Sequence, residues 1–87
     1  MAEEEKTFSK QLIGKSVVSK TGKNFGTVGD IVFETHSGEL INLVLANPTA
    51  YAEKLELEKD RENKTLIPFS AVVAVGDFVV IAEEDII

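Results

Sequence analysis

The side chains that could support catalysis or metal binding are few and widely spaced in this sequence. There is no Cys and a single histidine, His36, and only Asp30 and Asp77 are carboxylates embedded in apolar segments. Acid–base, nucleophilic and metal chemistry all need several such groups to converge. His36 lies in a turn with no second ligand beside it, and the two aspartates suit backbone hydrogen bonds at a turn and a bulge. We therefore expect no enzyme activity, no catalytic residue, no cofactor and no metal site.

A glycine-bracketed basic segment, residues 21–26, is the second feature that could bind a ligand. Such a loop could cradle a phosphate. Its spacing is not that of a P-loop, however, and a strand rather than a helix is expected after it. A plain connection between two strands is the favoured interpretation.

Composition limits the classes of partner. The 87 residues form one domain, and 9 basic against 15 acidic residues give a net charge of −6, which opposes a nucleic-acid backbone. The first five residues are acidic and lack the apolar core of a secretion signal. The longest apolar run, residues 66–81, is interrupted by Gly76-Asp77 and is too short to cross a bilayer. We expect a cytoplasmic protein with no nucleic-acid partner and no direct membrane insertion.

The elements that must position any site are predicted to be strands. Gly76-Asp77 separates two β-branched runs, so residues 72–75 should pair with residues 78–81 in a tight hairpin, preceded by a strand at residues 64–67 that ends at Pro68. Further strands are predicted at residues 16–20, 26–35, 39–45 and 55–58, with one helical turn at residues 49–54. A β-bulge at Gly29 would repair the phase of the second strand.

This count predicts an all-β protein: a small antiparallel β-barrel of about six strands with at most one short helix. Residues 1–10 are expected to form a flexible acidic tail, residues 11–82 the domain, and residues 83–87 a C-terminal tail that frays or, alternatively, adds a strand to a partner's sheet. The predicted core is apolar and spread over all strands: Val17, Val28, Ile31, Phe33, Ile41, Leu43, Leu45, Ile67, Phe69, Val72 and Val80.

The order of short motifs resembles the PRC-barrel family. The opening pattern is Leu12-Ile13-Gly14-Lys15-Ser16-Val17-Val18, followed by Gly22, Gly26, Val28 and Asp30, and the closing pattern is Ile67-Pro68-Phe69-Ser70-Ala71-Val72 with Val75-Gly76-Asp77. Each motif is weak alone, whereas the ordered set, from about residue 12 to residue 81, is fairly specific. The resemblance is strongest to short archaeal stand-alone members such as the cell-division protein B group.

The resemblance implies a non-catalytic protein-interaction adaptor. It implies an archaeal cell-division factor that binds SepF, the membrane anchor of FtsZ, at the division site. The alternative is a ribosome-maturation or RNA-processing module like the C-terminal domain of RimM. RimM carries a second, N-terminal domain that 87 residues cannot contain.

The predicted interaction surface lies on the third strand. Leu40 and Val44 fall on its outward side, with Tyr51 just beyond. An exposed apolar patch on a small protein marks an interface, and twofold dimers are the commonest oligomers, so we expect a homodimer and a partner contact around these residues. The alternative is that the loop at residues 48–53 folds over this side and buries it.

Overall fold

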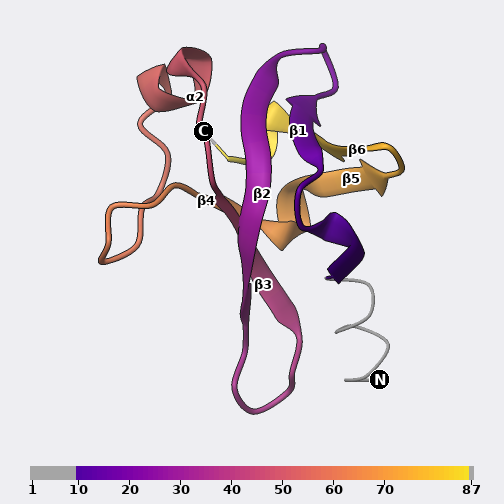
Figure 1. Cartoon of the computed structure of the whole chain (residues 1–87), viewed down its shortest axis with the longest axis vertical. Coiled ribbons are helices and arrows are strands. Elements are labelled where there is room, and N and C mark those ends of the chain that lie inside the picture. Colours follow the sequence, from indigo (N-terminus) through magenta and orange to yellow (C-terminus); the bar gives the residue numbers. More distant parts are fainter. Residues whose placement is uncertain (1–9, 87) are drawn as a thin grey trace.

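The computed structural model describes residues 10–86; residues 1–9, which carry most of the predicted acidic tail, and Ile87 lie outside the described part. Six strands dominate it (Figure 1): β1 (Ser16–Ser19), β2 (Asn24–Phe33), β3 (Leu40–Leu45), β4 (Leu66–Pro68), β5 (Val72–Val75) and β6 (Phe78–Ile81). The helix α2 (Ala50–Lys54) and two 3-10 turns, η1 (Phe69–Ala71) and η2 (Glu83–Asp85), connect or follow them. Residues 10–12 are also helical, which is one helical segment more than the sequence predicted.

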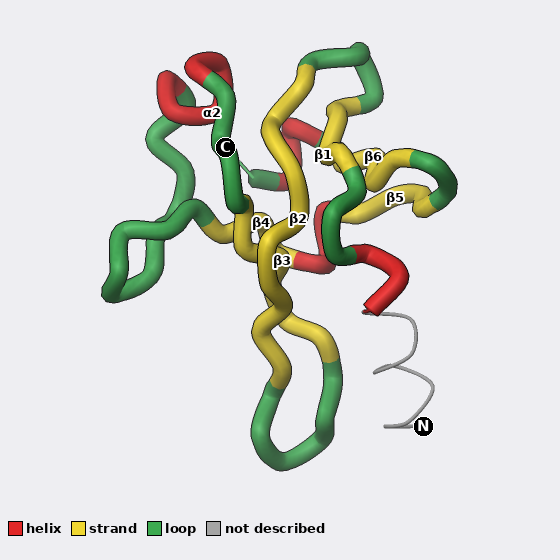
Figure 2. The backbone as a smooth tube through the Cα atoms, viewed as in Figure 1, coloured by secondary structure: helices red, strands yellow, loops and turns green. Residues whose placement is uncertain are grey.

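The strands form one sheet in the order β4-β3-β2-β1-β6-β5. All neighbours are antiparallel except β1 and β6, which are parallel. The long strand β2 pairs with β1 at its start and with β3 at its end, so it joins the two halves of the sheet (Figure 2). The all-β prediction of six strands is confirmed. The sheet bends around a core, but β4 and β5 are its two edges and no pairing between them closes a barrel.

The predicted bulge at Gly29 is confirmed by the register of β2 and β3. Val28 lies opposite Leu45 and Asp30 opposite Val44, so Gly29 is the extra residue. A Cβ atom on Gly29 would lie 2.7 Å from the Ala46 Cβ atom. The bulge therefore needs glycine because the two chains approach too closely for any side chain.

The segment between α2 and β4 departs from the prediction. Thr49 caps α2 by accepting a hydrogen bond from the Ala52 amide, and its hydroxyl also donates to the Asn24 carbonyl at 2.7 Å. The predicted strand at residues 55–58 is absent. Glu56 has a φ of 53°, in the left-handed region, so the backbone turns where the alternating pattern predicted an extended chain. The only pairing left of that predicted hairpin is a single bridge between Lys59 and Thr65.

The hairpin of β5 and β6 has the predicted boundaries, with one difference in its loop. Val75 pairs with Val79, so Gly76, Asp77 and Phe78 all lie between the last paired residues. The parallel pairing of β1 with β6 then sets which side chains of β6 face inwards: Val17 lies opposite Val79, and both are fully buried.

The core confirms part of the predicted set. Val17, Val28, Leu43, Leu45 and Ile67 are buried, and the largest fully buried side chain is Phe25, which the sequence had placed in a turn. Partly buried residues that pack against this core include the predicted Ile31, Phe69 and Val72.

The remaining three predicted core residues are not fully buried either. Ile41 is 42% exposed because the register shift between Val32 and Phe33 leaves it without a partner across the strand pair. Phe33 and Val80 are half-buried. On β6 the side chains that face the core are those of Val79 and Ile81, whereas the sequence predicted Val80.

Candidate protein-interaction site

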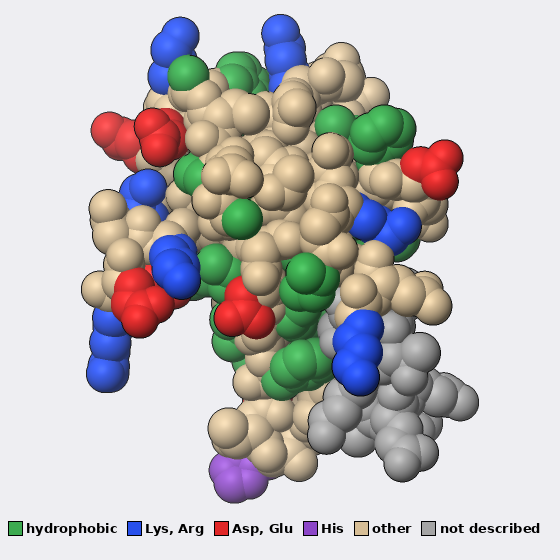
Figure 3. Space-filling model, in the orientation of Figure 1, with side chains coloured by type: hydrophobic (Ala, Val, Ile, Leu, Met, Phe, Trp, Pro, Cys, Tyr) green, Lys and Arg blue, Asp and Glu red, His purple; other side chains and the backbone are tan. Residues whose placement is uncertain are grey.

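The structure keeps the chemistry-bearing residues apart. Asp30 lies on β2, where its carboxylate accepts a hydrogen bond from the Ile31 amide at 2.8 Å. His36 is exposed at the end of the β2–β3 hairpin, and its amide donates to the Glu34 carboxylate (Figure 3). Asp77 is exposed in the β5–β6 loop. Within residues 10–86 no three His, Cys, Asp or Glu side chains are grouped so that they could hold a metal ion.

The three predicted interface residues do not form one surface. Leu40 is half-buried and packs against the core, and Val44 is only 6% exposed, so neither offers the open apolar surface that the sequence predicted. Val44 alternates with the core residues Leu43 and Leu45 and is not itself part of the core cluster, so it does face the other side of the sheet, as predicted, but it is covered there. In Figure 1, the helix α2, which contains Tyr51, and the loop between β2 and β3, after which β3 begins at Leu40, lie at opposite ends of the molecule. A role of these residues in binding stays a prediction.

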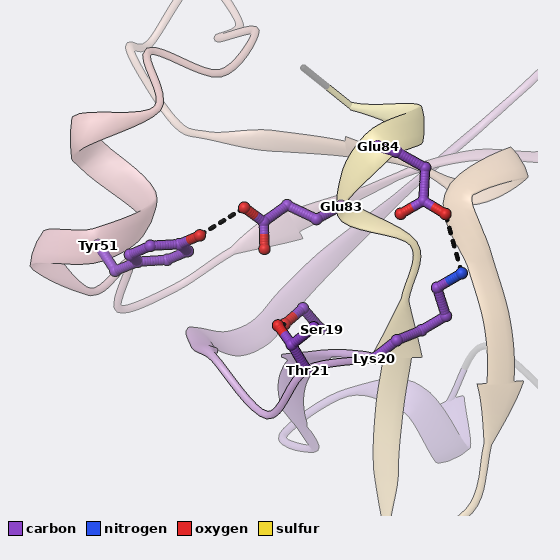
Figure 4. Close-up of a pocket in the computed structure, with 6 residues that line it drawn as sticks. All are labelled: Ser19, Lys20, Thr21, Tyr51, Glu83 and Glu84. Carbon is purple, nitrogen blue, oxygen red and sulfur yellow. Dashed lines mark hydrogen bonds and ion pairs between the residues drawn. The ribbon is translucent and has the colours of Figure 1, made fainter.

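Tyr51 instead anchors the C-terminal segment. Its ring packs edge-on against buried Phe25, with the ring centres 5.6 Å apart, and the Lys23 amine lies 5.6 Å from the Tyr51 ring centre. Its hydroxyl donates to the Glu83 carboxylate of η2, and in Figure 4 the two side chains point toward each other. This hydrogen bond, together with burial and the glutamate charge, raises the pKa of Tyr51 above its usual value.

A second contact holds η2 to the end of β1. The Lys20 amine lies 2.8 Å from the Glu84 carboxylate, and both side chains are largely exposed. The hydrogen bond to Glu84 raises the pKa of Lys20, and the same bond lowers the pKa of Glu84. Ile86 packs against the core. Residues 83–86 are thus fixed to the domain, in contrast to the fraying tail that the sequence predicted.

These contacts enclose a small pocket. It is lined by Ser19, Lys20, Thr21, Tyr51, Glu83 and Glu84 (Figure 4) and has a volume of about 270 Å³. Typical ligand sites begin at about 300 Å³. The polar groups of this pocket bond to one another, as with the Ser19 and Thr21 hydroxyls at 3.0 Å. Two of these bonds, from Tyr51 to Glu83 and from Lys20 to Glu84, hold η2 against the domain.

Large apolar side chains of residues 10–86 are exposed in three other places. Ile13, before β1, is 45% exposed. On the β2–β3 hairpin, Val32 and Ile41 are 36% and 42% exposed, and we call these two residues the hairpin patch. Figure 3 shows hydrophobic side chains on this face over the lower halves of β2 and β3. On the β5–β6 hairpin, Val73 and Phe78 are each more than half exposed. Sequence reasoning missed Phe78, although a run of four apolar residues at 78–81 indicates that both sides of that strand are apolar.

Comparison with known proteins matches almost the whole chain. Residues 4–85 match the PRC-barrel domain family. An uncharacterized protein from the archaeon Methanocaldococcus jannaschii is 34% identical over 82 residues, an alignment that covers 94% of this chain and 88% of that protein. The match includes both exposed hairpins and η2.

Proposed function

Since the chain belongs to the PRC-barrel domain family, we propose that it is a non-catalytic protein-interaction adaptor. Its partner is a SepF-like division protein, and it acts in archaeal cell division. The observation that carries the adaptor proposal is the exposure of Phe78 and Val73, at 53% and 52%, on a domain of only 87 residues. Both side chains lie on the same hairpin, and apolar patches exposed on a small domain are typical of surfaces that bind another protein.

The archaeal cell-division role rests on the resemblance to short stand-alone members of the family. The similarity to a chain of nearly the same length from an archaeon supports this class of protein. No helix in residues 10–86 is long and apolar enough to cross a membrane. An adaptor of this kind would work in the cytoplasm at the division site and reach the membrane through SepF.

The hairpin patch supports a second part of the proposal, a homodimer. Val32 and Ile41 lie on adjacent strands, so a twofold axis near the β2–β3 hairpin would bring the patch against its own copy. This contact replaces two of the originally predicted residues, Leu40, which packs against the core, and buried Val44, with their exposed neighbours.

Affinity capture on the full chain tests the adaptor proposal. The purified chain, tagged at residue 1, is incubated with lysate of the cells that produce it, and bound proteins are identified by mass spectrometry. We expect division proteins, SepF first among them. Recovery of ribosomal proteins instead would favour the RimM-like alternative, and recovery of no stoichiometric partner would contradict the adaptor proposal.

A further inference from the structure

The outward side of β1, β6 and β5 is mostly apolar. In the register, Ser16 lies beside Phe78 on the neighbouring strand. One row further along, Val18, Val80 and Ala74 follow one another across three strands. The residues that alternate with them along β1 and β6 are buried: Val17, Ser19, Val79 and Ile81. The side chains of Ser16, Val18, Ala74, Phe78 and Val80 therefore point away from the core. We call this surface the outer face; Val73, the extra residue of a register shift in β5, adds to its edge.

The size of the outer face decides what it can bind. Three strands about 4.8 Å apart and four residues of about 3.3 Å each give an area roughly 14 Å wide and 13 Å long. A stable interface between two globular proteins takes about 800 Å² of accessible surface from each partner. That is about one seventh of this chain's 5562 Å² and more than this face can supply. An α-helix is about 10–12 Å across and rises 5.4 Å per turn, so two to three turns would cover the face.

The charges around the outer face indicate which side chains should lie beside the apolar stripe of such a helix. None of the five residues of the face is charged. Asp77, immediately before Phe78, is exposed and makes no ion pair with any residue between 10 and 86. The Lys15 amine is engaged by the Gly76 carbonyl, to which it donates at 2.6 Å. A second copy of the chain would bring its own net charge of −6 toward Asp77, whereas basic side chains would pair with Asp77.

We propose that the outer face binds one amphipathic helix of the partner protein. The helix places apolar side chains at positions i, i+3 or i+4, and i+7 against Phe78 and Val80, and it carries Lys or Arg beside this stripe, toward Asp77. Phe78 is the central anchor, because large aromatic side chains dominate small interfaces. The inference rests on the proposed adaptor function and names the surface and the partner segment through which it acts.

Site-specific crosslinking of the full chain tests the site and the occupant together. A photo-reactive phenylalanine analogue replaces Phe78 in one preparation and Val32, in the hairpin patch, in a control preparation. Each is irradiated in lysate of the source cells, and the crosslinked peptides are sequenced. We expect position 78 to crosslink to a peptide of another protein with the stated apolar spacing and flanking basic residues.

The remaining outcomes contradict the inference in distinguishable ways. Crosslinks from position 78 to residues 1–9 or to a second copy of the chain would show a different occupant, and so would a partner peptide without the helical pattern. Crosslinks to another protein from position 32 alone would leave the adaptor function standing and overturn the site. Absence of crosslinks to any other protein from both positions would overturn the inference and the proposed function together.

Affinity of the identified peptide gives the quantitative test. The peptide is synthesised and titrated into the full chain by calorimetry. Phe78→Ser should weaken binding at least tenfold, while the control Val32→Ser, also at a half-exposed strand position, should change it less than twofold. Replacing the basic residues of the peptide by Gln should weaken binding and reduce its salt dependence. Equal affinity for the Phe78→Ser and Val32→Ser proteins would overturn the role of the outer face.

Discussion

Tyr51 of α2 donates its hydroxyl hydrogen to the carboxylate of Glu83 in η2, although 32 positions separate the two residues in the sequence. Tyr51 also packs edge-on against Phe25, one of the most buried residues of β2. The contact therefore links the helix and the C-terminal segment to the core. It makes residues 83–86 part of the domain.

This contact predicts the titration of Tyr51. Because hydrogen bonding to Glu83 raises the pKa of the phenol above its usual 10.0, the contact stabilises the fold below pH 10 and is lost as pH rises through the raised pKa. Absorbance at 295 nm should show the single tyrosine ionising above pH 10 in the intact chain and closer to pH 10 in Glu83→Ala. Glu53→Ala, an equal change of charge at an exposed position on α2, is the control. Identical midpoints for the Glu83→Ala and Glu53→Ala proteins would show that the hydrogen bond does not form.

Replacement by alanine should destabilise the fold at Gly29 but not at Gly76. Gly29→Ala puts a Cβ atom 2.7 Å from the Ala46 Cβ atom and 3.1 Å from its Cα atom, so one strand must move, at a cost of about 1–3 kcal/mol in the free energy of unfolding. Gly76→Ala meets no atom within 4 Å and should change stability by no more than about 0.5 kcal/mol. Urea denaturation of both variants checks this, and a Gly29→Ala protein as stable as the parent would contradict the bulge geometry.

Alanine substitutions of two phenylalanines should show which of them belongs to the core. Phe25 is fully buried, so Phe25→Ala should lower the free energy of unfolding by about 3–5 kcal/mol, a large part of the stability of a small domain. Phe33 is half-buried near the end of β2, and Phe33→Ala should cost about 1–1.5 kcal/mol, half the value of full burial. Thermal unfolding followed by circular dichroism ranks the two. The reverse ranking would mean that the core lies where the sequence had placed it.

Local patterns in the sequence predicted the strands well. The hairpin of β5 and β6 follows from Gly76-Asp77 between two β-branched runs, and the bulge at Gly29 follows from a break in alternation. Both depend on neighbours in the chain. The strand predicted at residues 55–58 failed because a single backbone angle, the positive φ of Glu56, redirects the chain, and an alternating pattern carries no information about it.

The side of the sheet that each side chain faces, and whether the sheet closes into a barrel, could not be predicted. Both depend on pairings between segments that are distant in the sequence. Val79 rather than Val80 is buried because β6 pairs in parallel with β1, some 60 residues earlier. Ile41 is exposed because of a register shift between β2 and β3. The interface prediction did not foresee that Val44, on the side of β3 away from the core cluster, is covered, and it overlooked Phe78 because every residue of its strand is apolar.

Self-association through the hairpin patch is the fourth prediction. Light scattering should show a dimer at micromolar concentration that Ile41→Asp converts to a monomer, because a charge would be buried against its own copy. Val73→Asp, at a more exposed position on the β5–β6 hairpin, should leave the dimer intact. Val44→Asp is unsuitable, since it buries a carboxylate in the sheet and should unfold the domain. A monomer at every concentration, or a dimer unaffected by Ile41→Asp, contradicts the patch as a dimer contact.

Direct binding to SepF tests the central claim. The SepF-like protein of the same cells is titrated into the intact chain by isothermal calorimetry, with the Phe78→Ser protein as a second sample. The account predicts saturable binding of the intact chain with a Kd of about 1 μM, near −8 kcal/mol, and at least tenfold weaker binding of Phe78→Ser. Absence of measurable binding by the intact, folded chain would contradict the cell-division assignment.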